Sequence, residues 1–135
     1  NVDSGSKTTG LKGESDLSVE ALDNSGLASG KMIYFDYNSI EIHDDSLPLI
    51  TSAAETLTTN PTIRIRLEGH ADERGTREYN LALGERRAQS VRELIMLQGA
   101  NDNQIDVVSY GEEKPAVVGS DEQSWQQNRR VELIY

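Results

Sequence analysis

Residues 68–93 read EGHADERGTREYNLALGERRAQSVRE, and here a short charged loop runs directly into an amphipathic helix. The fold follows from this helix, whose phase can be worked out at about 100° per residue from Tyr79 to Gln98. Charged and polar residues fall on one side of it, and the opposite side is a broad apolar stripe that predicts packing on a core. The stripe consists of Leu81, Gly84, Ala88, Val91, Leu94 and Ile95.

Arg87 departs from this pattern, because it projects between Leu83 and Val91 on the flank of the apolar stripe. A guanidinium in that position needs a partner, since burying an unpaired charge is very costly. Three interpretations stay open. Arg87 could form an internal salt bridge, its stem could snorkel to water, or it could bind an anionic group from outside.

The loop before the helix favours the third interpretation. Gly75 ends the loop, and Thr76 is suited to cap the helix. Free backbone N–H groups at a helix start form an anion site, and an inward-facing Arg87 could fork onto the same carboxylate. Asp72, with Glu73 beside it, could take an ammonium group. The loop and helix together predict a pocket for a zwitterionic amino acid.

Composition narrows the classes of partner. The chain has 135 residues and a net charge of −10, which disfavours nucleic acid and anionic membrane surfaces. Seven of the thirteen basic residues lie between Arg64 and Arg92, and all seven are arginines, which suits carboxylate recognition. With no cysteine there is no disulfide or thiolate metal site, and we expect no cofactor. We find no signal peptide and no apolar run of the roughly 20 residues that span a membrane.

Domain organisation follows from where apolar residues are scarce. Residues 1–30 are rich in Ser, Gly, Thr and Asp, so we expect a flexible tether there and one domain over residues 31–135. The run at Lys31–Tyr37 is apolar on both faces and predicts a central strand. The last part, between 111 and 127, predicts mostly loop, with one helical turn near Asp121–Trp125.

Periodicity predicts the remaining elements and the fold class. We expect an α/β (α+β) sandwich of order β-α-β-α-β-β, with two main helices packed on a four-stranded mixed sheet. The first helix starts at Asp44–Ser46, tolerates Pro48 in its first turn, and stops at Asn60–Pro61. The other strands are Ile63–Glu68, Gln104–Tyr110 and Arg129–Tyr135, and Gly99 ends the second helix.

Five strings carry a resemblance to a known family: IYFDY, EGHADERGTREYN, LGERRAQSV, VSYGEEKPAV and NRRVELIY. In this order they resemble the OmpA-like peptidoglycan-binding domain, over about Lys31 to Tyr135. They are most similar to the lipoprotein members of that family. The resemblance implies a non-catalytic module that binds the meso-diaminopimelate residue of peptidoglycan stem peptides.

The resemblance also implies which residues bind. The aspartate of the family's GH-x-D motif falls on Asp72, and the arginine fifteen positions later falls on Arg87. Family members often carry a second aspartate where this chain has Asn38, so any ammonium contact there is expected to be weaker. The terminal NRR motif implies that Asn128 and Arg129 brace the pocket floor, and we expect Arg130 to be solvated. The full set of expected site residues is Asp72, Arg87, Asn38, Gly75, Thr76, Leu83, Asn128 and Arg129.

Partners and location are implied in the same way. The resemblance implies a lipidated cysteine at the mature N-terminus, which this chain lacks, and a domain held on the outer membrane facing the periplasm. It implies a role with the Tol system in envelope integrity and outer-membrane constriction at division. A TolB-like periplasmic propeller protein, with the other Tol proteins behind it, would dock around the same loop and compete with the cell wall.

Two alternatives remain. The chain could be the peptidoglycan anchor of another OmpA-like envelope protein, or a cell-wall hydrolase using His70 and Asp72. Against catalysis, the chain has only two histidines, and the second, His43, lies in a separate loop-like stretch. No Ser-His-Asp signature, phosphate-binding Gly loop or zinc-ligand spacing is present. We therefore expect no enzyme activity and no metal site.

Overall fold

The computed structural model describes residues 31–135, and the expected tether at residues 1–30 lies outside the described residues. Met32–Ile134 form one compact unit, which contains all of the helices and strands below. No described helix combines the length and the apolar character needed to cross a membrane.

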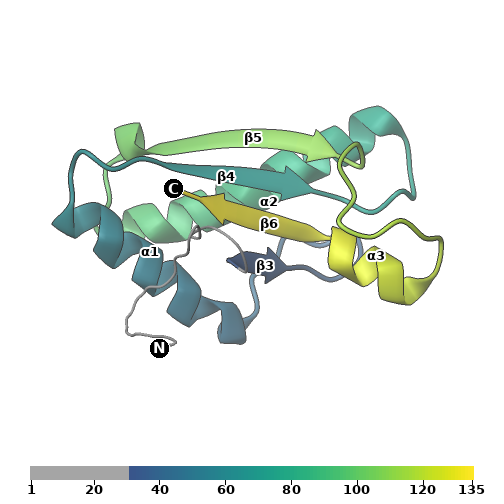
Figure 1. Cartoon of the computed structure of the whole chain (residues 1–135), viewed down its shortest axis with the longest axis horizontal. Coiled ribbons are helices and arrows are strands. Elements are labelled where there is room, and N and C mark those ends of the chain that lie inside the picture. Colours follow the sequence, from purple (N-terminus) through teal and green to yellow (C-terminus); the bar gives the residue numbers. More distant parts are fainter. Residues whose placement is uncertain (1–30) are drawn as a thin grey trace. The chain divides into compact units, whose positions relative to one another are not determined.

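Four strands form one mixed sheet in the order β3-β6-β4-β5 (Figure 1). β4 and β5 run parallel, while β6 pairs antiparallel with both β3 and β4. This arrangement confirms the predicted four-stranded mixed sheet. The strands are β3 (Met32–Tyr34), β4 (Ile65–His70), β5 (Ile105–Gly111) and β6 (Arg130–Ile134).

The central position expected for the first strand is wrong, because β3 lies at the edge of the sheet and has only three residues. Ile33 and Phe35 are buried, but Tyr34 between them is 45% exposed. A tyrosine tolerates water at its hydroxyl end, so an apolar run need not be buried on both faces. Beyond the strand, the Phe35 N–H still bonds the carbonyl of Arg129 at 2.8 Å, and the chain then turns at Asn38.

The helices form close to their predicted ranges. The 3-10 turn η1 (Asp44–Ser46) leads into α1 (Leu47–Thr59), which carries its proline in the first turn. α2 (Arg77–Leu97) packs across β4 and β5 and contacts α1, and Figure 1 shows it running behind the strands. The core between these elements includes Ile50 and Leu57 of α1, Leu67 of β4, Val91 of α2 and Leu133 of β6.

Two glycines set the distance between α2 and β4. A Cβ atom placed on Gly69 would lie 1.8 Å from the carbonyl oxygen of Gly84, which no backbone could accommodate without moving. A Cβ atom on Gly84 would lie 2.4 Å from Oγ of Ser109. The close contact therefore holds the end of β4 against the middle of α2, and the charged loop runs between these two points.

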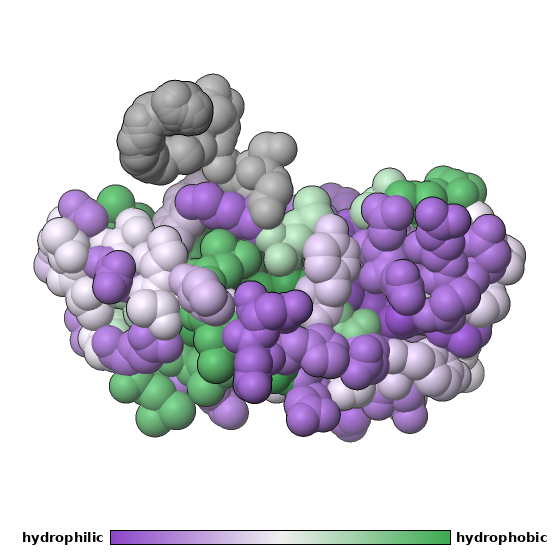
Figure 2. All heavy atoms as spheres, turned by 90° about the horizontal axis from the view of Figure 1, so that it is seen from below, coloured by the Kyte–Doolittle hydropathy of each residue, from purple (hydrophilic) through white to green (hydrophobic). Residues whose placement is uncertain are grey.

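The expected single turn near Asp121 is a full short helix, α3 (Glu122–Asn128), which leads directly into β6. The Asp121 side chain caps it by accepting the Ser124 N–H at 2.8 Å. A further 3-10 turn, η2 (Asp102–Gln104), precedes β5. Hydrophilic side chains cover the right-hand end of the face in Figure 2, where α3 lies.

Candidate functional site

The guanidinium of Arg87 is completely buried, and three backbone carbonyls hold it. Nε donates to Ser39 O at 2.8 Å, Nη1 to His70 O at 2.9 Å, and Nη2 to Asp36 O at 3.0 Å. Its centre lies 5.3 Å from the ring of Phe35. Within residues 31–135, Arg87 forms no ion pair with a carboxylate, so both the internal salt bridge and the snorkelling stem are wrong.

The buried charge of Arg87 remains available to a ligand. Burial, followed by the neighbouring charge of Arg129, lowers the pKa of Arg87 to about 10, so the group stays cationic at neutral pH. Within residues 31–135, three of the five guanidinium N–H groups are bonded to carbonyls, which leaves one on Nη1 and one on Nη2. Such a pair matches the two oxygens of a carboxylate.

Arg87 lines a small cavity of about 50 Å³. The cavity is walled by the turn after β3, by the loop between β4 and α2, and by the first turns of α2. Its lining consists of Tyr37, Asn38, Ala71, Asp72, Arg74, Gly75, Tyr79, Asn80, Leu83 and Arg87.

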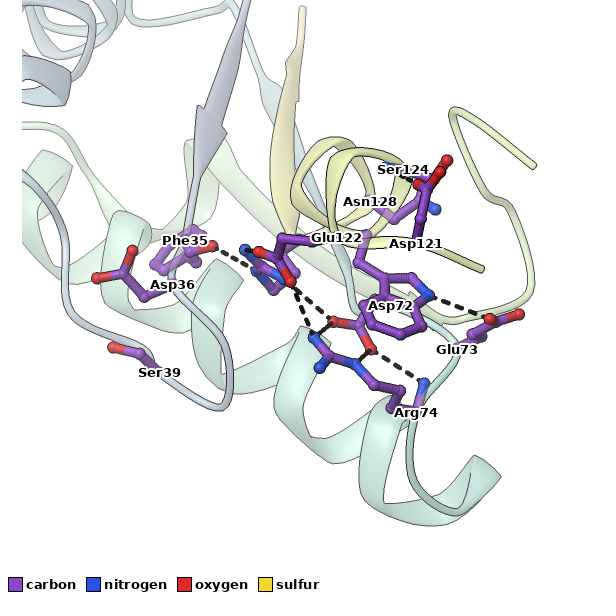
Figure 3. A network of polar contacts seen from close by, with 12 residues as sticks. Phe35, Asp36, Ser39, Asp72, Glu73, Arg74, Asp121, Glu122, Ser124 and Asn128 are labelled. Carbon is purple, nitrogen blue, oxygen red and sulfur yellow. Dashed lines mark hydrogen bonds and ion pairs between the residues drawn. The ribbon is translucent and has the colours of Figure 1, made fainter. Parts of the chain in front are cut away.

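Asp72 supplies the negative charge of this cavity and is only 4% exposed. Its Oδ1 accepts the backbone N–H of Arg74 at 3.0 Å and Nε of Arg74 at 3.2 Å, and its Oδ2 accepts Nη2 of Arg74 at 2.8 Å (Figure 3). Arg129 adds a longer contact to Oδ2 at 3.4 Å. Burial raises the pKa of Asp72, but these hydrogen bonds outweigh it and hold the pKa below its usual value. Asp72 is therefore a carboxylate at neutral pH.

Residues 34–129 match the OmpA family. The chain belongs to the OmpA family. It is 52% identical over 100 residues to the peptidoglycan-associated lipoprotein of Pseudomonas putida, covering 74% of this chain and 60% of that protein. With the protein of the same name from Pseudomonas aeruginosa it shares 48% identity over 111 residues, covering 82% of this chain and 66% of the relative. The chain thus spans about two thirds or less of these relatives.

Two solved structures share this fold. The crystal structure of the peptidoglycan-associated lipoprotein from Burkholderia pseudomallei aligns with a TM-score of 0.76 and 46% identity, covering 77% of this chain and 88% of that one. The C-terminal domain of Helicobacter pylori MotB aligns with a TM-score of 0.68 at 24% identity, covering 76% of this chain and 80% of that one. The second likeness concerns the fold alone.

The eight residues expected at the site of this OmpA-family chain are not all in one place. Five of them line the cavity: Asn38, Asp72, Gly75, Leu83 and Arg87. Thr76 does not, because its Oγ1 accepts the Tyr79 N–H at 3.1 Å and is committed to capping α2. Gly75 has a φ of 104°, which lets the loop turn into the helix.

The two residues expected to brace the pocket floor have different positions. Arg129 lies directly behind Asp72, with Nε on the carbonyl of Phe35 at 2.9 Å and Nη2 on Glu122 at 2.9 Å. Asn128 is directed elsewhere, since its Oδ1 accepts the Ala116 N–H at 2.7 Å in the loop before α3. Asn128 is not among the residues that line the cavity.

Arg130 was expected to be solvated, and this is wrong. The residue is 3% exposed, and its Nη2 pairs with Oε2 of Glu132 at 2.7 Å and donates to the carbonyl of Lys114 at 3.0 Å. The long loop before α3 supplies that carbonyl and covers the strand. Strand alternation alone could not reveal this cover.

The His70 and Asp72 pair considered for catalysis is not assembled. The His70 ring is 1% exposed, is stacked on Tyr110 with ring centres 5.6 Å apart, and does not line the cavity. Burial, then the charges of Arg130 and Lys114, lower its pKa to about 3. Only its backbone carbonyl serves the site, through Arg87. In the part of the chain that the structure describes, no three His, Cys, Asp or Glu side chains could hold a metal ion.

Sequence reasoning missed half of the cavity lining, namely Tyr37, Ala71, Arg74, Tyr79 and Asn80. Tyr79 lines the cavity, and its hydroxyl donates to the side chain of Asn38 across the cavity mouth. Arg74 carried a usable signal, because an aspartate two residues earlier in a turn often accepts the backbone N–H of the later residue. Nothing in the local sequence indicated that Tyr37 would line the cavity.

Proposed function

We propose that this chain is a non-catalytic peptidoglycan-binding module that holds the free zwitterionic end of a meso-diaminopimelate side chain. One observation carries the proposal: within the described residues, Arg87 is a buried cation bonded only to carbonyls, and it shares a cavity with the carboxylate of Asp72. Similarity to relatives named peptidoglycan-associated lipoprotein supports the choice of ligand.

Each charged end of the ligand has a matching group. The ligand carboxylate would take the two remaining N–H groups of Arg87, and its ammonium would pair with Asp72. Asn38 and Tyr79 at the cavity mouth would face the methylene chain or the ammonium. Two to four charge-assisted hydrogen bonds at about 1.5–3 kcal/mol each, less the cost of association, correspond to micromolar binding of an isolated stem peptide.

The wider role also belongs to the proposal. The chain would connect the outer membrane, through an N-terminal lipid anchor, to the cell wall, and would face the periplasm. Support comes from the word lipoprotein in the names of the relatives. As a partner, a TolB-like propeller protein of the Tol system fits the cavity edge, where the aromatic side chains of Tyr37 and Tyr79 are exposed. Capture of sacculi and the propeller protein on one molecule would argue against competition.

Calorimetric titration of three stem peptides into the full chain tests the ligand. The first contains meso-diaminopimelate, the second lysine, which lacks the distal carboxylate, and the third 2-aminopimelate, which lacks the distal ammonium. We expect micromolar binding of the first and at least about tenfold weaker binding of the other two, since each loses one charge-assisted contact.

Variants of two neighbouring arginines complete this test. Arg87→Lys keeps the charge, but a lysine has too few N–H groups to bond three carbonyls and a carboxylate at the same time. This variant should therefore no longer bind the diaminopimelate peptide. Arg86→Lys is the matched control on the exposed side of the same helix and should bind normally. Thermal unfolding checks that both variants fold. Equal binding of all three peptides, or normal binding by Arg87→Lys, would contradict the proposal.

A further inference from the structure

Both oxygens of the Asp72 carboxylate are already occupied. A carboxylate offers about four lone-pair positions, and here the three hydrogen bonds from Arg74 and the longer one from Arg129 fill them. An ammonium group from outside could therefore pair with Asp72 only if one of these donors left. The pocket described above is closed on its anionic side.

Of the two side chains on Asp72, Arg74 is the one that can leave. Arg129 is 4% exposed and is tied to the carbonyl of Phe35 and to Glu122 as well. The side chain of Arg74 is 30% exposed, and within the described residues it donates hydrogen bonds to Asp72 alone. Its nearest other carboxylate, Glu122, lies 3.9 Å away toward the surface and could receive it (Figure 3).

Two aromatic rings enclose the guanidinium of Arg74. Its central carbon lies 4.0 Å from the ring centre of Tyr37 and 3.9 Å from that of Trp125. Trp125 is itself held, because its Nε1 donates to Glu73 at 3.0 Å. One carboxylate and two ring faces make a site for a cation, and ring faces attract an alkylammonium as they attract a guanidinium.

The size of the cavity points the same way. At about 50 Å³ it is much smaller than the roughly 150 Å³ cavity that a benzene molecule fills. The zwitterionic end of diaminopimelate, with its carboxylate, ammonium, α-carbon and first methylene, has about as many heavy atoms as benzene. Arg74 forms part of the cavity wall, so its departure would enlarge the cavity on the side of Asp72.

We propose that Arg74 is an internal stand-in for the ligand ammonium, which must displace it from Asp72 before the pocket can close on a diaminopimelate-type ligand. This inference rests on the proposed function. The chain then binds from the minor population in which Arg74 has left, and its apparent affinity is reduced by that fraction. Arg74 is a specificity-determining residue in this scheme, because only a ligand with a cation can replace it.

The test is calorimetric titration of the full chain and of Arg74→Gln with the diaminopimelate and 2-aminopimelate peptides. Removing the competitor should raise the affinity for diaminopimelate by about three- to tenfold. It should leave the affinity for 2-aminopimelate unchanged, because that peptide carries no distal ammonium. Arg77→Gln is the matched control: it removes one charge from an exposed arginine on the same segment, paired with Glu113 at 2.7 Å, and should change neither affinity.

Each other outcome has a definite meaning. Weaker or unchanged diaminopimelate binding by Arg74→Gln would overturn the displacement while leaving the proposed ligand intact. An equal gain for both peptides would also overturn it, since the variant would then have loosened the pocket generally. No binding of diaminopimelate by any protein, wild type included, would overturn the proposed function and this inference together. Arg74→Ala should agree in direction with Arg74→Gln.

Discussion

Arg87 and His70 are both buried and lie next to each other in the fold, and the two side chains meet the cost of burying a charge in opposite ways. Arg87 keeps its charge, because three backbone carbonyls solvate it. His70 loses its charge, because burial and then two nearby cations, Arg130 and Lys114, lower its pKa to about 3. Within the described residues, both of its ring nitrogens also lack a hydrogen-bond partner. A guanidinium cannot deprotonate at neutral pH and an imidazole can, so only the arginine remains able to bind an anion.

His70 should make the fold sensitive to acid. Its pKa falls from 6.5 in the unfolded chain to about 3 in the folded one, so below pH 6.5 the unfolded chain takes up a proton that the folded chain does not. Stability is therefore lost as the pH drops from 6.5 toward 3, by about 2 kcal/mol between pH 7 and pH 5. His70→Leu, similar in volume, should remove this loss in urea unfolding measured at both pH values.

The exposed His43 provides the control for this measurement. His43→Gln should show the same loss of unfolding free energy between pH 7 and pH 5 as the wild type. If His70→Leu kept the full loss as well, other groups would account for the acid sensitivity, and the assignment to His70 would be wrong.

At the scale of elements, α2 and β4 meet through glycines, and this contact positions the pocket. Gly69 and Gly84 bring the two backbones together just before the loop that carries Asp72 and one turn before Arg87. Thr76 then starts α2 at a defined residue through its cap. The spacing between the anionic and cationic sides of the cavity thus depends on helix and strand, and the loop only spans them.

Gly84→Ala tests this contact by opposing two effects. Helix propensity alone would stabilise the variant by about 1 kcal/mol. The added Cβ, however, would lie 2.4 Å from Oγ of Ser109, which is itself bonded to the carbonyl of Leu81, and 2.9 Å from the carbonyl oxygen of Gly69. We expect overpacking to win, with a net loss of about 1–3 kcal/mol in the free energy of unfolding.

The reverse change on the exposed side of the same helix calibrates the propensity effect. Ala82→Gly should cost about 1 kcal/mol, since it changes propensity without touching β4. Both variants can be compared by chemical denaturation. A stabilised Gly84→Ala would show that α2 and β4 do not need the close approach described here.

At the scale of the molecule, one compact unit contains the whole candidate site. Every buried apolar residue and every cavity-lining residue in the described chain lies within Met32–Ile134. The family match, over residues 34–129, falls inside the same unit. We therefore propose residues 31–135 as the binding domain, with residues 1–30 outside it.

Removal of residues 1–30 tests this division. The shortened chain should unfold at the same temperature as the full chain and bind the diaminopimelate peptide with the same affinity, because it retains the whole core and cavity. Calorimetry of both chains, by heating and by titration, provides the comparison. A clearly lower unfolding temperature or weaker binding would show that the first thirty residues contribute to the domain.

The sequence by itself determined the order of the elements, the fold class, the cap at Thr76 and the inward direction of Arg87. These are local properties, since periodicity, capping and turn chemistry depend on residues within a few positions of one another. Asp72 and Arg87 were predicted as a pair because a strand end, a loop and a helix of defined phase connect them. The resemblance to a known family added Asn38 and the expected ligand.

Only the tertiary structure decided what each charged group contacts. It put β3 at the sheet edge, buried Arg130 under a distant loop, and gave Arg87 the carbonyls of residues 36, 39 and 70 in place of a carboxylate. It also brought Tyr37 and Trp125, 88 positions apart, onto the two faces of Arg74. Such contacts depend on how separate elements pack, and the sequence near a residue does not indicate which distant residues it will contact.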